Sequence, residues 1–451
     1  MSNRKSLDEV IDIITDYYKE MREINSADKK ELVQNWIANI QKKDDRVAKQ
    51  NLISDLASML KEKNIVLGDE HKIYPNVPPE DGLVYRIYGL CVYDAINSLS
   101  PSVESVWISA NQIARYVESG VIKNYYNYMP DASEMESIQS RLEEICQKPH
   151  NKSHPILRGF IESSETRIQS YIPPRAFSRS LRTRRLVTPS FSLDDMKEMD
   201  EKSRELSKQS VKGRLNIMVG GGQNVGKTTR QIGLLLLKDP ETENITIYES
   251  EHEMRFQLKW PGSVVELQDI DDMGFSAVQR DVFRNGSHTI VFAEPREGIE
   301  AHYALLSCSR GSDQTVMTYH LRVPDLDDPV SAIREFAVLV NDYRKTNVVD
   351  VYRSIASGLD IIWVLENIGG KRIDYSIFLP EMQEGHFSPR GDYIQPEPRA
   401  RVLAKYDYTS KKLEWTGEML PDLMVRFMTN KGKSDLEILR SLGLTDLKRE
   451  V

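Results

Sequence analysis

The sequence has few cysteines, no long apolar run and only a small excess of one charge. Its three cysteines, Cys91, Cys146 and Cys308, lie far apart and form no CxxC pair. This spacing supplies neither a disulfide framework nor a set of zinc ligands, so we expect reduced, buried thiols. The chain carries 60 basic and 68 acidic residues, a formal charge of −8, which argues against a protein that coats nucleic acid.

The lack of long apolar runs bears on location. The most apolar stretches, such as residues 361–365, have the length of a strand, whereas a membrane-spanning helix needs about 20 apolar residues. The N-terminal segment contains charges but no apolar core followed by a cleavage site, so it does not have the pattern of a secretory signal. We therefore expect a cytoplasmic protein that contacts membranes only peripherally.

A length of 451 residues predicts two or three domains. We divide the chain into a helical N-terminal extension (1–75), an α+β domain with a linker (76–205) and an α/β domain (206–451). In the extension, apolar residues recur at helical spacing over residues 7–18 and again over 52–60. These helices either pack on their own chain or dock on a partner, and the sequence leaves both alternatives open.

Two segments mark the organisation of the second region. Residues 71–82 contain three prolines and a turn dipeptide, which makes them the best linker candidate. Between 83 and 189 the mixture of alternating apolar residues and one helical pattern predicts a small α+β domain. Its end is basic, with Arg182, Arg184 and Arg185 close together. Such a cluster forms either a solvated face or a contact to an anion at a domain or subunit boundary.

From residue 215 onward, short β-branched segments alternate with helical patterns, which predicts an α/β domain with a largely parallel sheet. The first of these segments continues into GGGQNVGKTT, which contains the G-x-x-x-x-G-K-T pattern of a P-loop, or Walker A motif. An apolar strand precedes it and an amphipathic helix follows it, as this motif requires. The residues predicted to bind nucleotide are Gly221, Gly222, Gln223, Asn224, Val225, Gly226, Lys227, Thr228 and Thr229.

Each part of the motif has a physical role. The glycines let successive backbone N–H groups and the positive end of the next helix face a triphosphate. Lys227 is expected to bridge the β- and γ-phosphates, and the Thr228 hydroxyl to hold Mg²⁺. The cofactors predicted by the sequence are therefore ATP and Mg²⁺.

Hydrolysis also requires carboxylates at the ends of neighbouring strands. Glu294 directly follows the apolar segment HTIVFA and is our main catalytic candidate, as well as the second candidate ligand of Mg²⁺. Glu249 and Glu253 follow the segment NITIY and are further candidates. His320 ends another strand pattern, where it serves either as a sensor of the γ-phosphate or as an ordinary hydrogen-bonded polar residue.

Taken together, these motifs resemble the secretion and traffic ATPase family, most strongly its Tad/Flp-pilus branch. The family serves type II and type IV secretion, conjugative transfer and pilus assembly. IYESEHEM stands where the family has its acidic box, HTIVFAEPRE resembles its Walker B segment, and RGSDQTVMTYH resembles its glycine-rich turn and histidine box. By this resemblance, Glu249 and Glu253 are the acidic-box glutamates, and Glu294 and His320 take the corresponding family positions.

The resemblance also implies an architecture and partners. It predicts a RecA-type P-loop domain behind a smaller α+β domain, six copies in a ring, and a protein of the inner membrane as the platform on which the motor acts. Arg167 and one of the arginines near Arg184 would bring positive charge to the nucleotide. Direct binding of nucleic acid is not expected.

Several positions depart from the family pattern. Ser250 replaces the aspartate of the acidic box, Ala293 replaces the glycine before the Walker B glutamate, and Pro295 follows that glutamate. These changes keep a second hypothesis open, in which the chain is a nucleotide-gated regulatory or binding subunit with little hydrolysis. An enzyme acting on DNA ranks last, because residues 215–381 contain no basic tract.

Overall fold

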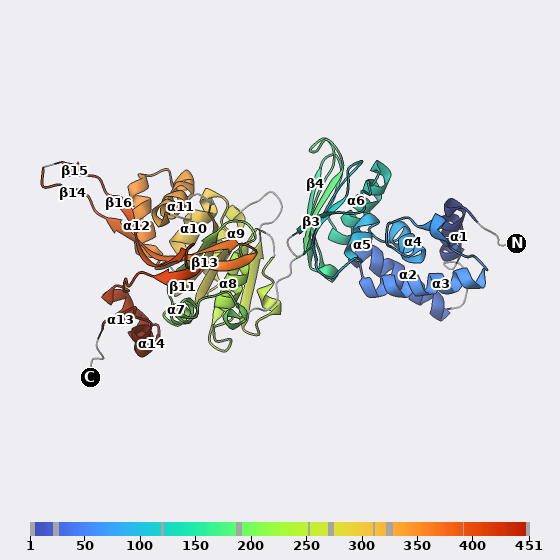
Figure 1. Cartoon of the computed structure of the whole chain (residues 1–451). Coiled ribbons are helices and arrows are strands. Elements are labelled where there is room, and N and C mark those ends of the chain that lie inside the picture. The colour runs from blue at the N-terminus through green and yellow to red at the C-terminus, as the bar shows by residue number, and fades with distance from the viewer. Residues whose placement is uncertain are drawn as a thin grey trace. The chain divides into compact units, whose positions relative to one another are not determined.

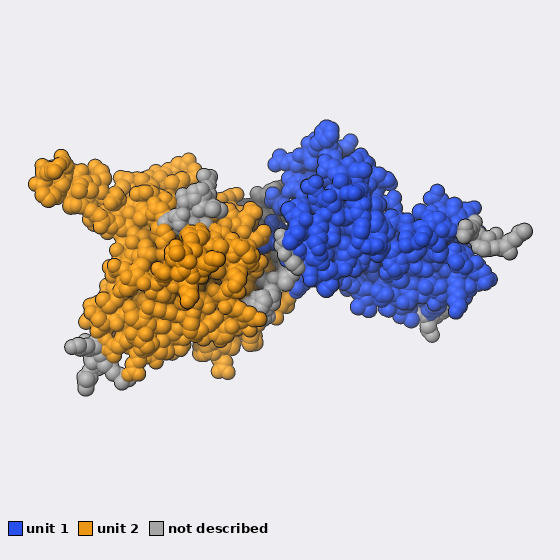
Figure 2. Space-filling model, viewed as in Figure 1, with its two compact units in different colours: residues 1–187 blue, residues 188–451 orange. Residues whose placement is uncertain are grey.

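The computed structural model describes residues 5–20, 27–118, 121–185, 192–250, 253–268, 275–309, 312–321, 328–390 and 392–447. The chain forms two compact units, residues 1–187 and residues 188–451, which Figure 2 distinguishes by colour. Glu251 and Gly311, which belong to the predicted acidic box and glycine-rich turn, lie outside the described residues. The predicted division at residues 75 and 205 stays a prediction.

The first unit combines helices with a six-stranded sheet (Figure 1). Its helices are α1 (Leu7–Glu20), α2 (Ala27–Lys43), α3 (Arg46–Glu62), α4 (Pro79–Ile87), α5 (Val92–Asn97) and α6 (Ala132–Cys146). Its strands are β1 (Val103–Ser109), β2 (Arg115–Glu118), β3 (Val121–Asn124), β4 (Ile156–Ile161), β5 (Thr166–Tyr171) and β6 (Ser180–Arg185). The strand order is β3-β2-β1-β6-β5-β4, and the pairs are antiparallel.

One apolar core joins the helices to one face of this sheet. Val10 of α1, Leu52 of α3 and Ile168 of β5 belong to the same buried cluster. Tyr74 and Val77 also belong to it. The proline-containing segment predicted as a linker is therefore anchored to this core by the buried side chains of Tyr74 and Val77.

The other face of the sheet carries arginines. Side chains alternate between the two faces of a strand, and on β6 Leu181 and Thr183 are buried whereas Arg182 and Arg184 are exposed. Arg184 is directly opposite Arg167 on β5. The basic stretch identified in the sequence thus forms part of a polar sheet face.

The second unit is an α/β domain around a nine-stranded sheet. Its strands are β7 (Ile217–Gly221), β8 (Asn244–Glu249), β9 (Ser263–Gln268), β10 (Thr289–Ala293), β11 (Gln314–His320), β12 (Ile361–Ile368), β13 (Lys371–Gln383), β16 (Glu397–Asp407) and β17 (Lys412–Trp415). A two-stranded hairpin, β14 (His386–Phe387) and β15 (Tyr393–Ile394), lies apart from that sheet. The helices are α7 (Glu201–Lys212), α8 (Lys227–Leu235), α9 (Phe275–Arg284), α10 (Gly298–Ser307), α11 (Pro329–Arg344), α12 (Val348–Gly358), α13 (Asp422–Asn430) and α14 (Leu436–Ser441).

The sheet order β17-β16-β13-β12-β7-β11-β10-β8-β9 has a parallel part and an antiparallel part. The strands from β12 to β9 pair in parallel, and β13, β16 and β17 add antiparallel. This confirms the predicted α/β fold with a largely parallel sheet. Strand β11 lies between the P-loop strand β7 and the strand β10 that precedes Glu294, as in a RecA-type P-loop domain.

Helices cover both faces of this sheet (Figure 1). Ile217 and Val219 of β7 share one core with Leu206 of α7 and Ile232 of α8. Met218, on the opposite face, belongs to a second core that includes residues of α9, α10, α11 and α12. Because parallel strands end at one edge, the carboxyl ends of β7, β8, β10 and β11 meet there, and the predicted site residues of this unit follow those ends.

Candidate nucleotide site

The predicted P-loop connects β7 to α8. Two of its glycines have positive φ angles, which other residues adopt only with strain. Gly221 has φ +147°, and a Cβ there would lie 2.4 Å from the carbonyl oxygen of Leu365. Gly226 has φ +96° and is the N-cap residue of α8. The motif glycines are thus required by close approach of β12 in one case and by a left-handed turn in the other.

The start of α8 is suited to bind an anion. Gly226 has no side chain with which to cap the first N–H groups of the helix, and these groups have no partner within the helix. Their orientation and the helix dipole favour a negatively charged ligand. The P-loop residues therefore fit the phosphates of a nucleotide.

Lys227 is buried at the same point, with 8% of its surface exposed. Its Nζ donates hydrogen bonds to the carbonyl oxygens of Gly221, at 3.1 Å, and Gly222, at 2.7 Å. The other loop residues differ in exposure: Gln223 and Asn224 are exposed, whereas Val225 is buried. Two carbonyl oxygens of the P-loop thus hold the ammonium group of Lys227 beside the loop, where it can bind a phosphate.

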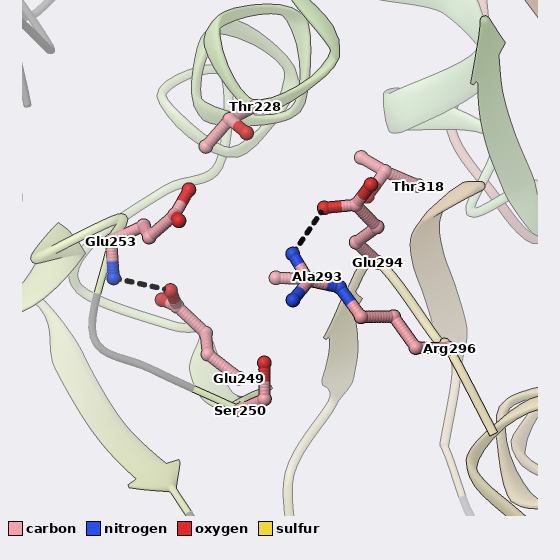
Figure 3. Close-up of a pocket in the computed structure, with 8 residues that line it drawn as sticks. All are labelled: Thr228, Glu249, Ser250, Glu253, Ala293, Glu294, Arg296 and Thr318. Atoms are coloured by element: carbon pink, nitrogen blue, oxygen red, sulfur yellow. Dashed lines mark hydrogen bonds and ion pairs between the residues drawn. The ribbon is translucent and has the colours of Figure 1, made fainter. Parts of the chain in front are cut away.

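Thr228 reaches a pocket at the ends of the strands, shown in Figure 3. The pocket lining consists of Thr228, Glu249, Ser250, Glu253, Ala293, Glu294, Arg296 and Thr318. Figure 3 shows the carboxylates of Glu253 and Glu294 on opposite sides of this space, which Thr228 also borders. The structure thus brings together the predicted residues of the P-loop, the acidic box and the Walker B segment, although their catalytic roles stay predictions.

Glu249 ends β8 and is almost completely buried, with 2% of its surface exposed. Its carboxyl oxygens accept hydrogen bonds from the backbone N–H groups of Glu253, at 2.6 Å, and Met254. Burial raises the pKa of Glu249 to about 8, against the opposing effect of those two N–H groups. At neutral pH this carboxyl group is therefore largely protonated, and it orders the loop that carries Glu253.

Glu294 directly follows β10 and has a left-handed backbone, with φ +60°. Its Oε2 accepts a hydrogen bond from Nη2 of Arg296 at 3.1 Å, and its Oε1 lies 3.8 Å from Nδ1 of His320. Burial acts to raise the pKa of Glu294, but Lys227, Arg296 and His320 together hold it below its usual value. Glu294 is therefore ionised at neutral pH, in contrast to Glu249.

His320 ends β11, where it pairs in register with Gly221 of the P-loop strand. Burial, followed by the nearby charge of Lys227, lowers the pKa of its ring, although Glu294 acts in the opposite direction. The ring is thus neutral at neutral pH and lies beside Glu294. Of the two alternatives for this histidine, the geometry favours a contact within the site over an isolated strand end.

The oxygen donors of the pocket fit a hard cation. Mg²⁺ is usually bound by one or two protein oxygens together with substrate phosphates and water, and Thr228 and Glu294 provide such oxygens in one pocket. Throughout the described ranges, no group of three or more His, Cys, Asp and Glu side chains is arranged to hold a metal ion alone. The residues present therefore fit Mg²⁺ that is bound together with a nucleotide.

Arg167 and Arg184 belong to the first unit. They are directly opposite each other on β5 and β6, and Arg184 is exposed. The pocket of Figure 3 is lined by residues of the second unit. The prediction that Arg167 and Arg184 act on the nucleotide stays a prediction.

A buried ion pair beside the P-loop was not recognised in the sequence. Arg230, one turn into α8, donates to the buried carboxylate of Asp374 on β13. The other oxygen of Asp374 accepts a hydrogen bond from Oγ of Ser203 on α7 at 2.6 Å. Residues 144 positions apart meet here, so no local pattern in the sequence indicated the contact.

No family model matches the chain. In sequence it is 22% identical over 262 residues to the conjugal transfer protein TrbB of Rhizobium radiobacter, covering 57% of this chain and 77% of that protein. It is also 22% identical over 275 residues to the probable conjugal transfer protein TrbB of Sinorhizobium fredii, covering 60% and 81%. In structure it is similar to the pilus retraction motor PilT with bound ADP, with 12% identity, a TM-score of 0.49, and coverage of 78% of this chain and 89% of that one.

The similarity to conjugal transfer proteins confirms the resemblance to the secretion and traffic family, because conjugative transfer is one of the processes that the family serves. The Tad/Flp-pilus branch stays a prediction. Among the described helices, none has the length and apolar character needed to cross a bilayer.

Proposed function

We propose that this chain hydrolyses ATP and acts as the motor of a secretion, conjugation or pilus-assembly machine. The observation that carries the proposal is the buried Lys227 at the uncapped start of α8, next to Thr228, which lines a pocket together with the ionised Glu294. A cation, the N–H groups of a helix N-terminus and a carboxylate at one sheet edge are what phosphoryl transfer to water requires. The sequence similarity to conjugal transfer proteins supports the biological setting.

In this proposal each residue acts through its position. The N–H groups at the start of α8 and the ammonium group of Lys227 bind the phosphates. Glu294 orients the attacking water and accepts a hydrogen bond from it, since its carboxylate is already ionised. Mg²⁺, when bound, supplies positive charge that stabilises the transferring phosphoryl group. His320, beside Glu294 and in register with Gly221, is placed to respond to the γ-phosphate.

The finer parts of the proposal come from the family resemblance. Six copies would form a ring in which opening and closing of domains around ATP produces rigid-body motion. The motion would act on a platform protein of the inner membrane, so the motor would work at the cytoplasmic face and touch the membrane peripherally. Arg167 or Arg184 would then bring charge to the nucleotide, completing each site.

A specific observation favours the second candidate, a nucleotide-gated regulatory subunit. Both carboxyl oxygens of Glu249 are engaged by backbone N–H groups, and its raised pKa keeps it protonated at neutral pH. In this second candidate, Glu249 orders the loop that carries Glu253 and takes no part in hydrolysis. With Ser250 in place of an aspartate, fewer carboxylates are available to the metal, and slow hydrolysis would follow.

Nucleotide binding and hydrolysis separate these candidates. We would measure ATP binding by titration calorimetry and ATP hydrolysis at increasing protein concentration, for the wild type and for Lys227→Ala. Lys212→Ala, which removes an exposed lysine at the end of α7, is the matched control. A motor predicts that Lys227→Ala abolishes binding, whereas the control and wild type hydrolyse ATP at a specific rate that rises with concentration. Binding without hydrolysis at any concentration would select the regulatory subunit, and absence of binding to the wild type would reject both.

A further inference from the structure

The hairpin of β12 and β13 borders the P-loop on the side away from the carboxylates. Strand β12 pairs with β7 in parallel, with Leu365 opposite Gly221. The chain then turns at Gly369 and Gly370, whose φ values are +61° and +86°, and returns as β13. This turn places the beginning of β13 at the same sheet edge as the P-loop.

Arg372, the second residue of β13, lies against the P-loop itself. A Cβ built on Gly226 would be 3.3 Å from Cδ of Arg372, so the arginine side chain passes directly over the residue that precedes Lys227. Arg372 is opposite Asn367 in the β12–β13 ladder. The contact joins two segments that are far apart in the sequence but adjacent through strand pairing.

The hairpin is fixed to α8 by the buried pair of Asp374 and Arg230. Asp374 lies two residues after Arg372 on β13, and Arg230 lies three residues after Lys227 on α8. Less than a tenth of either side chain is exposed, and Ser203 supplies an additional hydrogen bond to Asp374. Because a buried charge pair is costly to separate, the hairpin holds a defined position relative to the P-loop.

The guanidinium group of Arg372 is available to a ligand. Arg372 is exposed, and within the described part of the chain its side chain has neither an ion pair nor a hydrogen bond. Its neighbour Lys371, by contrast, is 3.2 Å from a carboxylate oxygen of Glu198. An arginine without a protein anion, held beside an anion-binding loop, is suited to a phosphate, since its planar fork matches phosphate oxygens.

We infer that Arg372 binds the α-phosphate end of the nucleotide in the same subunit, an inference that rests on the proposed function. The sheet order decides which end of the triphosphate it meets. Glu294 follows β10, on one side of the P-loop strand, whereas β12 and β13 lie on the other side. If the γ-phosphate meets Lys227 and Glu294, the opposite end of the triphosphate extends toward Arg372. Arg372 then supports ATP and ADP equally, because both nucleotides have an α-phosphate.

The test compares ADP and ATP binding by titration calorimetry for the wild type, Arg372→Ala and the neighbouring control Lys371→Ala. We expect Arg372→Ala to bind ADP and ATP each about tenfold more weakly, as loss of one charge-assisted contact predicts, while Lys371→Ala binds like the wild type. Arg372→Lys should recover part of the lost affinity, because it keeps the charge but not the fork. In hydrolysis assays the KM for ATP should rise about tenfold in Arg372→Ala, since the lost contact is shared by the bound substrate and the transition state.

Other results would overturn the inference. Unchanged affinity in Arg372→Ala would exclude a contact with the nucleotide. A loss confined to ATP, or a large fall in hydrolysis at saturation, would assign Arg372 to the γ-phosphate instead. Failure of the wild type to bind ADP or ATP would reject the proposed function, whereas normal binding by the wild type and unchanged binding by Arg372→Ala would reject only this inference.

Discussion

Two buried lysines, Lys49 in the first unit and Lys227 in the second, have different hydrogen-bond partners. Lys49 in the first unit is 5% exposed and Lys227 in the second is 8% exposed. Lys49 donates to two buried carboxylates, those of Asp44 and of Asp94, the latter at 2.6 Å. Lys227 donates to the neutral carbonyl oxygens of two glycines.

The difference separates a structural charge from a binding charge. The negative charges that compensate Lys49 come from its own unit, so the cluster connects α3 to α5 and to the end of α2 without a ligand. Around Lys227 the carbonyl oxygens orient the ammonium group but carry no net charge, and the uncapped helix end adds positive potential. Such a site gains from a bound anion, whereas the site around Lys49 has no need of one.

The largest expected effect is on stability, from Lys49→Met. Removing the lysine leaves two buried carboxylates without their cation, which costs about 3–5 kcal/mol when a buried pair is broken. We expect native-state hydrogen exchange to show this loss in α3 and α5, with β7 unaffected. Lys227→Met is the counterpart, and it should change the free energy of hydrogen exchange of β7 by less than about 1 kcal/mol. The hydrogen bonds of Lys227 to Gly221 and Gly222 go to neutral carbonyl oxygens, and Glu294 keeps Arg296 as a cationic partner. Equal losses in both variants would remove the distinction between the two lysines.

The next effect is on catalysis, from Glu294→Gln. The substitution keeps the shape of the side chain but removes the ionised carboxylate that the proposal assigns to the attacking water, and it should lower turnover about 10²- to 10³-fold. ATP binding, measured by calorimetry, should weaken little, because the phosphates are bound by the P-loop. Glu241→Gln, at an exposed position before β8, is the matched control. If Glu294→Gln hydrolysed ATP as fast as this control, Glu294 would not be the catalytic carboxylate.

The P-loop and the strand-end glutamates of the second unit could be predicted because local sequence patterns define them. The P-loop is a continuous segment, so its glycines and Lys227 were identified from spacing alone. Glu294 and Glu249 could be recognised because each stands at the end of an apolar segment, Glu249 as the last residue of β8 and Glu294 directly after β10. Parallel strands bring such positions to one edge, and the close placement of these residues therefore followed from the fold class.

Contacts between distant segments could not be predicted in this way. The position of Arg372 beside Gly226 depends on β12 pairing with β7 and on the turn that follows. The packing of Tyr74 into the first core depends on helices that precede it and strands that follow it. The role of Glu249 also depends on burial, which decides that Glu249 is a protonated acceptor of N–H bonds rather than a free carboxylate.

The smallest expected effect is on the pH dependence of stability, through Glu249. Its pKa is raised from 4.5 to about 8 in the folded chain, mainly by burial. Below pH 4.5 both states are protonated; between these two pKa values only the unfolded state loses its proton, so stability falls as pH rises through this window. In Glu249→Gln this loss is absent. Between pH 5 and pH 8 the free energy of unfolding of the variant should therefore rise relative to that of the wild type, by on the order of 1–3 kcal/mol.

Urea unfolding of the full chain at several pH values measures this gain, with Glu241→Gln as the exposed control whose curve should stay parallel to that of the wild type. Because the backbone N–H groups of Glu253 and Met254 partly stabilise an ionised Glu249, the gain should be smaller than burial alone predicts. Parallel curves for Glu249→Gln and the wild type would mean that Glu249 is ionised in the folded chain. Glu249 would then join Glu294 as a charged carboxylate beside the nucleotide, and the contrast between the loop-ordering and the catalytic glutamate would be lost.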